Sequence, residues 1–291
     1  DELAPTKEDA SHAKAANRDK LSLGARLRPA SQTMMRRLKS TAGRGLFSAG
    51  MHARFLEDKA AVLVFHRVDD RLENNPISCS STFFREFCRF AKNYFDVIGF
   101  GEVLDRLSEG RDLSGSLAIT FDDGYRDNAT IAAPILREFG LPACFFIATG
   151  FIGTDRIADW DADRGIRSEW MDWPQIRELR AQNFELGAHT CNHVDLGVVS
   201  LEEARREIVG SRERLEAELG ESIDLFTYPF GHARSITEEC RELVRSLGFR
   251  CCPSAYGGIV RPGTDPFRME RQPISPWHLS PWQFGFELMR A

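Results

Sequence analysis

The sequence predicts an α/β fold of parallel βα units, closed as a barrel or laid out as a doubly wound sheet. Short apolar runs and stretches of helical period alternate six or seven times along the chain. The 291 residues are 42% hydrophobic and 28% charged, as in a globular protein, and we expect a single main domain. Polar side chains directly follow several apolar runs, as they do where a site forms at the carboxyl ends of strands.

The amino-terminal part differs in character from the remainder. Residues 1–30 are polar and aperiodic, which predicts a disordered or vector-derived segment. Residues 31–58 carry apolar residues at helical spacing with arginines between them, which predicts a basic amphipathic helical arm. Such a helix either makes peripheral membrane contact, here through residues 31–56, or packs on the domain with its basic side in water, which is the commoner arrangement. We expect residues 59–291 to form the folded domain.

The charge argues against nucleic acid as a partner, because the net charge is −5 and the pI about 5.9. Residues 1–60 contain 12 Lys/Arg and 7 Asp/Glu, whereas the remaining residues contain 26 and 36. A basic segment therefore precedes an acidic body.

The seven cysteines are odd in number, irregularly spaced and without a CxxC pair, which predicts free thiols in a reducing compartment. No apolar run approaches the ~18 residues that a transmembrane helix needs, and no hydrophobic core of a signal peptide is visible. These features predict a cytoplasmic location, with association at the inner face of the membrane.

The predicted elements follow one another along the chain. Strands are expected at 61–65, 95–98, 116–120, 143–148, 184–188, 224–228, 249–252 and 269–274. Helices are expected at 82–93, 101–109, 128–139, 173–182, 201–219, 235–247 and 281–290. The acidic segment 150–169 is expected to form a loop over the strand ends.

The stretch from Thr120 to Gly124 ends one buried strand with two adjacent carboxylates, Asp122 and Asp123, and a glycine turn. Two neighbouring carboxylates repel each other if both stay charged and unpaired, and a bound cation is the simplest way to relieve this repulsion. One aspartate would bind the cation and the other would be free to take a proton. Alone, Asp-Asp-Gly is more often an ordinary turn.

Other strand ends also carry polar groups, namely His66, the pair His189 and His193, and Pro229-Phe230-Gly231. In a barrel these ends converge on one face. Two imidazoles and one carboxylate are a common ligand set for zinc, and cobalt, iron or nickel accept the same donors. A metal lowers the pKa of a bound water from 15.7 to about 7, and the second aspartate can take its proton.

These motifs, in this order, resemble the polysaccharide deacetylases, the NodB-homology carbohydrate esterases. The similarity covers about residues 60–275 and is closest in style to the poly-N-acetylglucosamine deacetylase branch. It implies a distorted (β/α)7-type barrel and metal-dependent removal of acetyl groups from N-acetylated or O-acetylated sugars of a polysaccharide or glycan precursor. The motifs that carry it are Val62–Val68 with its His-Arg-Val, Thr120–Gly124, Pro-Ala-x-Phe-Phe-Ile at 142–147, Glu185–Gly187 leading to His189-Thr-x-x-His193, and Tyr228–Gly231.

The resemblance also implies roles for these residues. Asp122 matches the catalytic base, and Asp123, His189 and His193 match the metal ligands. Phe230 stands where the family uses a backbone N–H to hold the oxyanion. The implied mechanism is attack of metal-activated water on the acetyl carbonyl, followed by protonation of the leaving amine.

Two positions depart from the family pattern. Thr227 stands where the family commonly has an arginine that orients the base, and Arg271 is our candidate for the missing guanidinium. The late Leu-x-His that usually supplies the acid has no clean counterpart. We assign the acid to His66, as in the poly-N-acetylglucosamine branch, with His278 and His232 in reserve.

Alternative interpretations follow from the same residues. Cys191 lies between the two ligand histidines and is interpreted as a bystander rather than a ligand. The domain could be an inactive carbohydrate-binding protein on the same fold, or an amidase acting on a non-sugar amide. The basic arm could also serve as a membrane or nucleic-acid tether.

Overall fold

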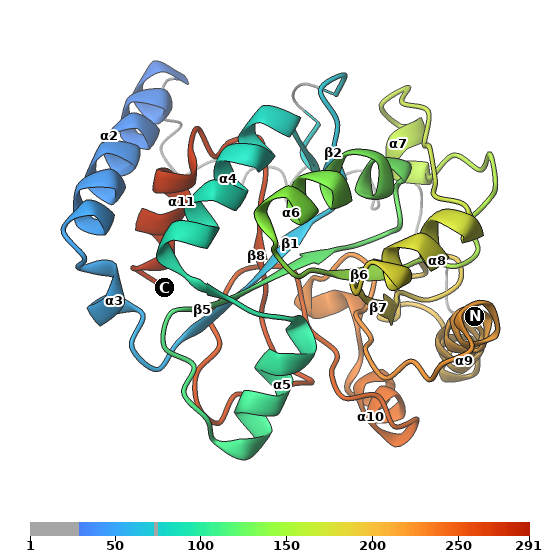
Figure 1. The fold of residues 1–291 in the computed structure, drawn as a ribbon. Helices are drawn as coiled ribbons and strands as arrows, with labels where there is room; N and C mark the ends of the chain where they lie inside the picture. The colour runs from blue at the N-terminus through green and yellow to red at the C-terminus, as the bar shows by residue number, and fades with distance from the viewer. Residues whose placement is uncertain (1–28, 73–74) are drawn as a thin grey trace, which may run out of the picture.

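The computed structural model describes residues 29–72 and 75–291 of the chain (Figure 1). The segment predicted to be disordered or vector-derived, 1–30, lies outside the described residues except for Pro29 and Ala30, which begin a helix. Among the described helices, none is long and apolar enough to cross a bilayer. All seven cysteines are free, as predicted.

A six-stranded parallel sheet forms the centre of the molecule, in the order β7-β6-β5-β1-β8 with β4 paired to β5. A short parallel pair, β2 with β3, lies beside it. The strands are β1 (Ala60–Phe65), β2 (Arg67–Val68), β3 (Ser78–Cys79), β4 (Asp96–Val97), β5 (Ser116–Phe121), β6 (Cys144–Ile147), β7 (Glu185–Ala188) and β8 (Gln272–Pro273).

Helices surround this sheet, with α4, α5 and α6 on the viewer's side in Figure 1 and α9 and α10 towards the lower right. The predicted distorted α/β barrel is confirmed. The helices are α2 (Pro29–Ser48), α3 (His52–Phe55), α4 (Ser81–Tyr94), α5 (Phe100–Glu109), a π-helical turn (Asn128–Ala132) continuous with α6 (Ala133–Phe139), α7 (Asp159–Ala162), α8 (Trp173–Ala181), α9 (Leu201–Leu219), a 3-10 turn (Ala233–Ser235), α10 (Glu238–Ser246) and α11 (Pro281–Leu288).

The strands β1, β5 and β6 are held under the helices by a row of phenylalanines. The ring of Phe121 stacks on those of Phe65 and Phe145 at centroid distances of 5.4 and 4.9 Å, and Phe84 of α4 closes on Phe65 edge-on at 5.1 Å. These rings immediately precede, or lie next to, the carboxyl ends of the strands. The polar residues that follow are therefore fixed on a close-packed base.

The far side of the barrel is less regular than predicted. The prediction of a strand at 224–228 is wrong, because this segment makes only an isolated parallel bridge, between Ala188 and Phe226. Pro229 lacks an N–H and cannot extend this ladder. The predicted strand 249–252 is also absent from the described residues, and 269–274 shortens to β8, which pairs with β1 through Leu63 and Val64. The barrel is distorted because this wall lacks a regular hydrogen-bonded ladder.

The helix expected within residues 31–56 is present, and it packs on the domain. α2 lies against α11, and Phe47 is buried against Phe90 and Trp282 at centroid distances of 4.9 and 6.2 Å. Lys39 pairs with Glu287 at 2.8 Å. The helix ends near Gly50, whose φ of +71° turns the chain into α3.

Close approach of α2 and α11 requires a glycine. A Cβ on Gly43 would lie 2.1 Å from the carbonyl oxygen of Trp282, whereas a Cβ on Gly45, two residues on, would meet nothing within 4 Å. The two glycines of one helix thus form a matched pair, one at a contact and one in water.

We expect Gly43→Ala to lower the free energy of unfolding by about 1–3 kcal/mol, because the helices must separate to admit the methyl group. The control Gly45→Ala should raise it by roughly 0.5–1 kcal/mol, as alanine does at an exposed helical position. Urea unfolding of both variants measures this. Equal stability of the two variants would contradict the close packing.

Candidate active site

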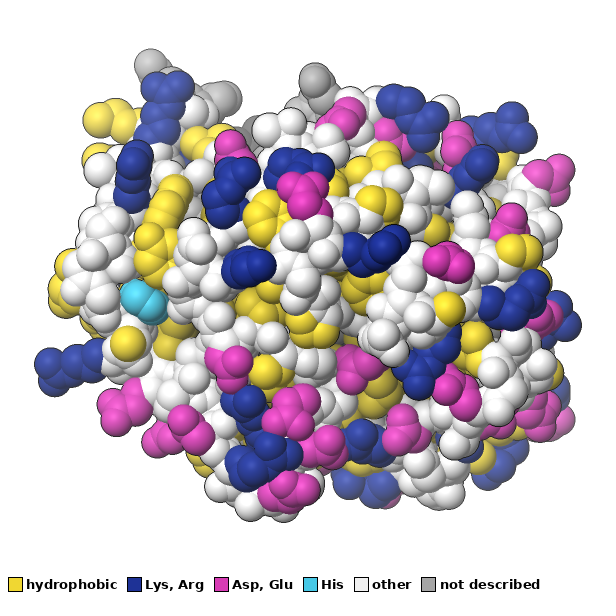
Figure 2. Space-filling model, viewed as in Figure 1, with side chains coloured by type: hydrophobic (Ala, Val, Ile, Leu, Met, Phe, Trp, Pro, Cys, Tyr) yellow, Lys and Arg dark blue, Asp and Glu magenta, His cyan; other side chains and the backbone are white. Residues whose placement is uncertain are grey.

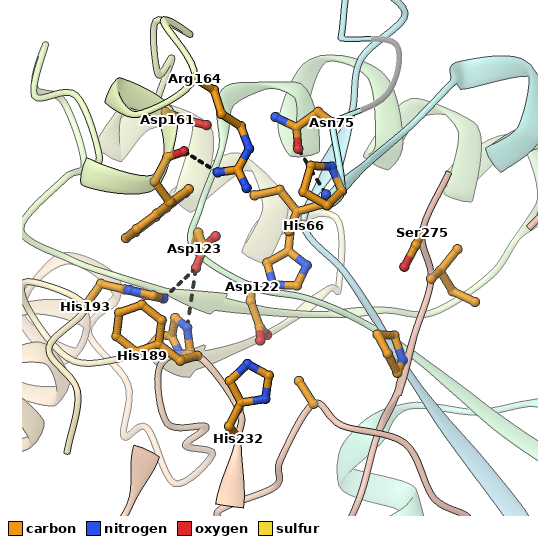
Figure 3. A pocket seen from close by; sticks show the side chains of 18 of the residues that line it. His66, Asn75, Asp122, Asp123, Asp161, Arg164, His189, His193, His232 and Ser275 are labelled. Carbon is orange, nitrogen blue, oxygen red and sulfur yellow. Dashed lines mark hydrogen bonds and ion pairs between the residues drawn. The ribbon is translucent and has the colours of Figure 1, made fainter. Parts of the chain in front are cut away.

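A pocket of about 460 Å³ opens at the carboxyl ends of the central strands (Figure 3). The strand ends contribute its polar residues, and aromatic side chains from the loops form its walls. The structure brings together in this pocket most of the residues singled out by sequence, namely His66, Asp122, Asp123, His189, His193, Phe230 and His232, with Trp160 and Trp277 beside them.

Asp123, His189 and His193 point at one another, as Figure 3 shows. The Oδ1 atom of Asp123 lies 3.4 Å from Nε2 of His189 and 3.2 Å from Nε2 of His193. All three side chains are buried. The other ring nitrogen of His189, Nδ1, is 2.8 Å from the carbonyl oxygen of Thr227, which directs Nε2 towards Asp123.

These three residues fit a divalent metal. The buried Oδ1 of Asp123 has no hydrogen-bond partner among the described residues, so it is an acceptor in need of a cation. A tetrahedral ion with bonds of about 2.0–2.1 Å separates its donors by about 3.3 Å, which matches the observed 3.2 and 3.4 Å. Two imidazoles and a carboxylate suit zinc and leave a position open for substrate or water.

Asp122 has a different environment from its neighbour. Thr120 and Asp122 are two residues apart at the end of β5 and therefore lie on the same face of the sheet. The guanidinium of the fully buried Arg271 donates to Oδ1 of Asp122 at 2.8 Å and to Oδ2 at 2.6 Å. It also donates to Thr120 and Thr227 hydroxyls at 2.9 Å and to the Ser254 carbonyl at 2.8 Å.

Arg271 therefore has an acceptor for each of its five N–H groups. It directly precedes β8, and it reaches Asp122 at the end of β5 from the far side of β1, which lies between these two strands. The Thr227 hydroxyl, at the position where the family commonly has an arginine, accepts one of these bonds.

Both aspartates are held in the ionised form. Burial raises the pKa of Asp122, but the charges of Arg271 and of nearby histidines outweigh it, so the pKa lies below the usual range. Burial likewise raises the pKa of Asp123, and the adjoining His193 and His189 bring it well below the usual range. Two adjacent carboxylates can both stay charged because Arg271 pairs with Asp122, while the imidazoles of His189 and His193 adjoin Asp123.

The backbone of the site is unusual. Asp123, Thr190, His193 and Phe230 all have left-handed φ angles, of 77°, 62°, 55° and 63°. Such a conformation costs a non-glycine residue roughly 1–2 kcal/mol. These turns aim the side chains of Asp123 and His193 back into the pocket, which a continued strand could not do.

Phe230 lines the pocket. Its N–H has no acceptor within residues 29–72 and 75–291, and its ring lies edge-on to His193 at a centroid distance of 4.7 Å. A free N–H beside the three candidate metal ligands can donate to an oxyanion that forms there.

The three histidines considered for the acid are placed differently. His66 and His232 both line the pocket near Asp122, whereas His278 is buried outside it, with Nε2 3.4 Å from Glu287 of α11 (Figure 3). His66 is partly buried, and its carbonyl accepts a hydrogen bond from Asn128 at 2.8 Å; His232 is exposed. The structure therefore leaves His66 and His232 as the groups able to reach a substrate.

Sequence reasoning missed the residues that hold the loop over the pocket. The expected loop 150–169 contains α7, where the Trp160 ring contacts that of His193 at a centroid distance of 4.4 Å and a tilt of 51°. Trp160 also donates from Nε1 to the Tyr125 hydroxyl at 2.7 Å. The buried Asp161 accepts from the Tyr125 hydroxyl at 3.1 Å and from Arg67 at 3.2 Å. The Asp-Trp-Asp run at 159–161 can be seen in the sequence, but Tyr125 and Arg67, to which it is hydrogen-bonded, lie far away along the chain.

A second support fixes the turn that bears His193. Glu207 of α9, itself buried, accepts at 2.7 Å from both the backbone N–H and the side-chain amide of Asn192. The amide oxygen of Asn192 accepts from Arg156 at 2.8 Å. Cys191 faces α9, where a Cβ on Gly210 would lie 3.0 Å from its sulfur, and it is not part of the group that could hold a metal.

Residues 110–252 match the family model described as "Polysaccharide deacetylase". This span includes both aspartates and the histidine pair, but not His66 or Arg271.

YxkH of Bacillus subtilis (strain 168) is 22% identical over 158 residues, which are 54% of this chain and 51% of YxkH. The poly-beta-1,6-N-acetyl-D-glucosamine N-deacetylase of Escherichia coli (strain K12) is 27% identical over 134 residues, 44% of this chain and 20% of that enzyme. The chain thus spans about half of one curated relative and about a fifth of the other.

The solved structure of the Streptococcus pyogenes deacetylase PplD in complex with acetate has a TM-score of 0.66 with this chain at 20% sequence identity. The match covers 78% of this chain and 96% of that chain. This similarity shows that the fold is shared.

Proposed function

Because the chain belongs to the polysaccharide deacetylase family, we propose that it is a metal-dependent hydrolase that removes acetyl groups from N-acetylated sugars of a polysaccharide or glycan precursor. One observation carries this proposal. Asp123 converges with two histidines, and its neighbour Asp122 is held apart from them by Arg271, all in one pocket. The two carboxylates can therefore serve two different purposes in one hydrolytic reaction.

Asp123, His189 and His193 would hold the ion, for which zinc is our first choice and cobalt, iron or nickel are alternatives. When bound, the ion supplies Lewis acidity to the acetyl carbonyl and to the attacking water. Glu207 and Thr227 keep the two histidines in place, since one fixes the turn beside His193 and the other binds Nδ1 of His189.

Asp122 acts as the general base. Its bidentate pairing with Arg271 keeps it ionised and fixes the orientation of its carboxylate. It takes the proton of the water as the new C–O bond forms. The N–H of Phe230, which lacks another acceptor in the described part of the chain, donates to the resulting oxyanion.

His66 acts as the general acid. It lines the pocket near Asp122, and its backbone is fixed by Asn128, so its ring can donate a proton to the departing sugar amine. His232, which also lines the pocket, is the reserve.

The substrate we favour is an oligomer of N-acetylglucosamine. The aromatic side chains of Trp160, Phe230 and Trp277 line the pocket and offer apolar faces to a sugar ring. The Escherichia coli relative is named for poly-beta-1,6-N-acetyl-D-glucosamine. Together they support an N-acetylated hexosamine rather than an O-acetylated sugar.

Acetate release from soluble acetylated oligosaccharides tests the proposal directly. We expect release from β-1,6-linked N-acetylglucosamine oligomers, its abolition by a chelator, and its recovery when zinc is added back, because the ion is an essential Lewis acid. His66→Gln should lose most activity and retain the metal. Release that persists unchanged in chelator would rule out the metal-dependent mechanism, and a fully active His66→Gln would rule out its role as acid.

The pH profile of Arg271→Met tests the pairing with Asp122. Without the guanidinium, burial raises the pKa of Asp122, so the base becomes protonated at higher pH. We expect the acidic limb of the kcat profile to move up by about one pH unit or more, with partial return in Arg271→Lys. Arg250→Met, whose side chain pairs with Asp105 and Asp224 away from the pocket, is the control. A uniform loss with an unmoved limb would mean a structural role only.

A further inference from the structure

The outward side of α2 and α3 exposes an apolar surface. Met34, Met35, Leu38, Met51 and Phe55 have exposed fractions of 64, 50, 55, 48 and 40%. We refer to these five residues as the α2–α3 face. The other exposed large hydrophobic residues of the described chain are spread over several loops and α9. An apolar surface concentrated on one helical segment is typical of a binding site.

The same segment is exclusively basic. Residues 29–56 contain no aspartate or glutamate, and they contain Arg36, Arg37, Arg44 and Arg54 in addition to Lys39. Lys39 is paired with Glu287, but none of the four arginines forms an ion pair with a described residue. Figure 2 shows these cationic side chains interleaved with hydrophobic ones over α2, at the left of the view.

Packing does not account for these exposed side chains. The inward side of α2 is already fully engaged, with Gly43 against Trp282, Phe47 in the aromatic cluster and Lys39 on Glu287. The helix is therefore a fixed part of the domain, and its outward side is presented to the surroundings in one orientation. A preformed surface loses little conformational entropy on binding.

We propose that the α2–α3 face docks on an anionic lipid bilayer. Apolar side chains flanked by arginines are the pattern of helices that lie in the interface plane of a membrane. Each arginine near the surface adds attraction to anionic headgroups. A second copy of the chain fits less well, because a symmetric contact would bring the unpaired arginines together. The attachment is peripheral, and it requires nothing of the reaction proposed above.

The inward side of α2 also contacts the segment that leads to the pocket. The Oγ of Ser40 in α2 lies 2.5 Å from the Oγ of Ser280, and the segment just before Ser280 carries the exposed Trp277 and Leu279. Trp277 lines the pocket. α2 is therefore linked through Ser280 to a segment that forms one rim of the pocket.

Co-sedimentation of the full chain with vesicles tests this proposal. We expect binding to vesicles of phosphatidylcholine mixed with phosphatidylglycerol, weak binding to phosphatidylcholine alone, and release in high salt, because the arginines supply much of the attraction. The charge reversals Arg37→Glu with Arg44→Glu should lower the partition coefficient about tenfold or more. The pair Met35→Ser and Leu38→Ser should lower it as well, because it removes buried apolar area.

The matched control is Val198→Ser with Leu201→Ser, which removes exposed apolar side chains at the start of α9 and should leave binding unchanged. Circular dichroism and acetate release from a soluble oligomer should be the same in all these variants, so loss of docking is separated from loss of fold or activity.

Three results would overturn the proposal: no vesicle binding, equal binding by the charge-reversed chain, or a dimer in light scattering that the Met35 and Leu38 substitutions abolish. The last result would assign the face to a second copy.

Discussion

The buried ion pair between Arg271 and Asp122 is the interaction on which the site depends. Two charges removed from water are stable only when both are paired and their remaining donors and acceptors are satisfied. Arg271 meets this condition by bonding to β5, to the turn at Thr227 and to the carbonyl of Ser254. One guanidinium thus ties three segments into the irregular wall of the barrel, where a regular ladder is missing, and fixes Asp122, the base that we propose, at the same time.

The second constraint is the backbone at the strand ends. Left-handed conformations at Asp123, His193 and Phe230 are unfavourable for these residue types and persist because the sheet beneath is rigid. The stacked phenylalanines of β1, β5 and β6 supply that rigidity. The free energy that these conformations cost is spent when the chain folds, before any ligand binds. The donor groups are therefore already oriented when a metal or substrate arrives.

Sequence could predict those parts of the site that follow from local pattern. A buried strand ending in Asp-Asp and another followed by two histidines are visible in the residue order. Arg271 was reached only through the family resemblance, because Thr227 stands where that family commonly has an arginine. The contacts of Trp160 and Asp161 could not be predicted, because the loop has no periodicity and its partners, Tyr125 and Arg67, lie far away in sequence. The strand expected at 224–228 failed because an apolar extended segment looks the same whether or not a neighbour pairs with it.

The central claim is that two adjacent carboxylates do separate work, and metal stoichiometry measured beside turnover in Asp122→Asn and Asp123→Asn tests it most directly. Asp122→Asn should keep one zinc ion per chain while turnover falls by about 10² or more, since only the base is lost. Asp123→Asn should lose both the ion and the turnover. If the two variants retain the same amount of metal, or if Asp122→Asn turns over at the unmutated rate, the division of labour is contradicted.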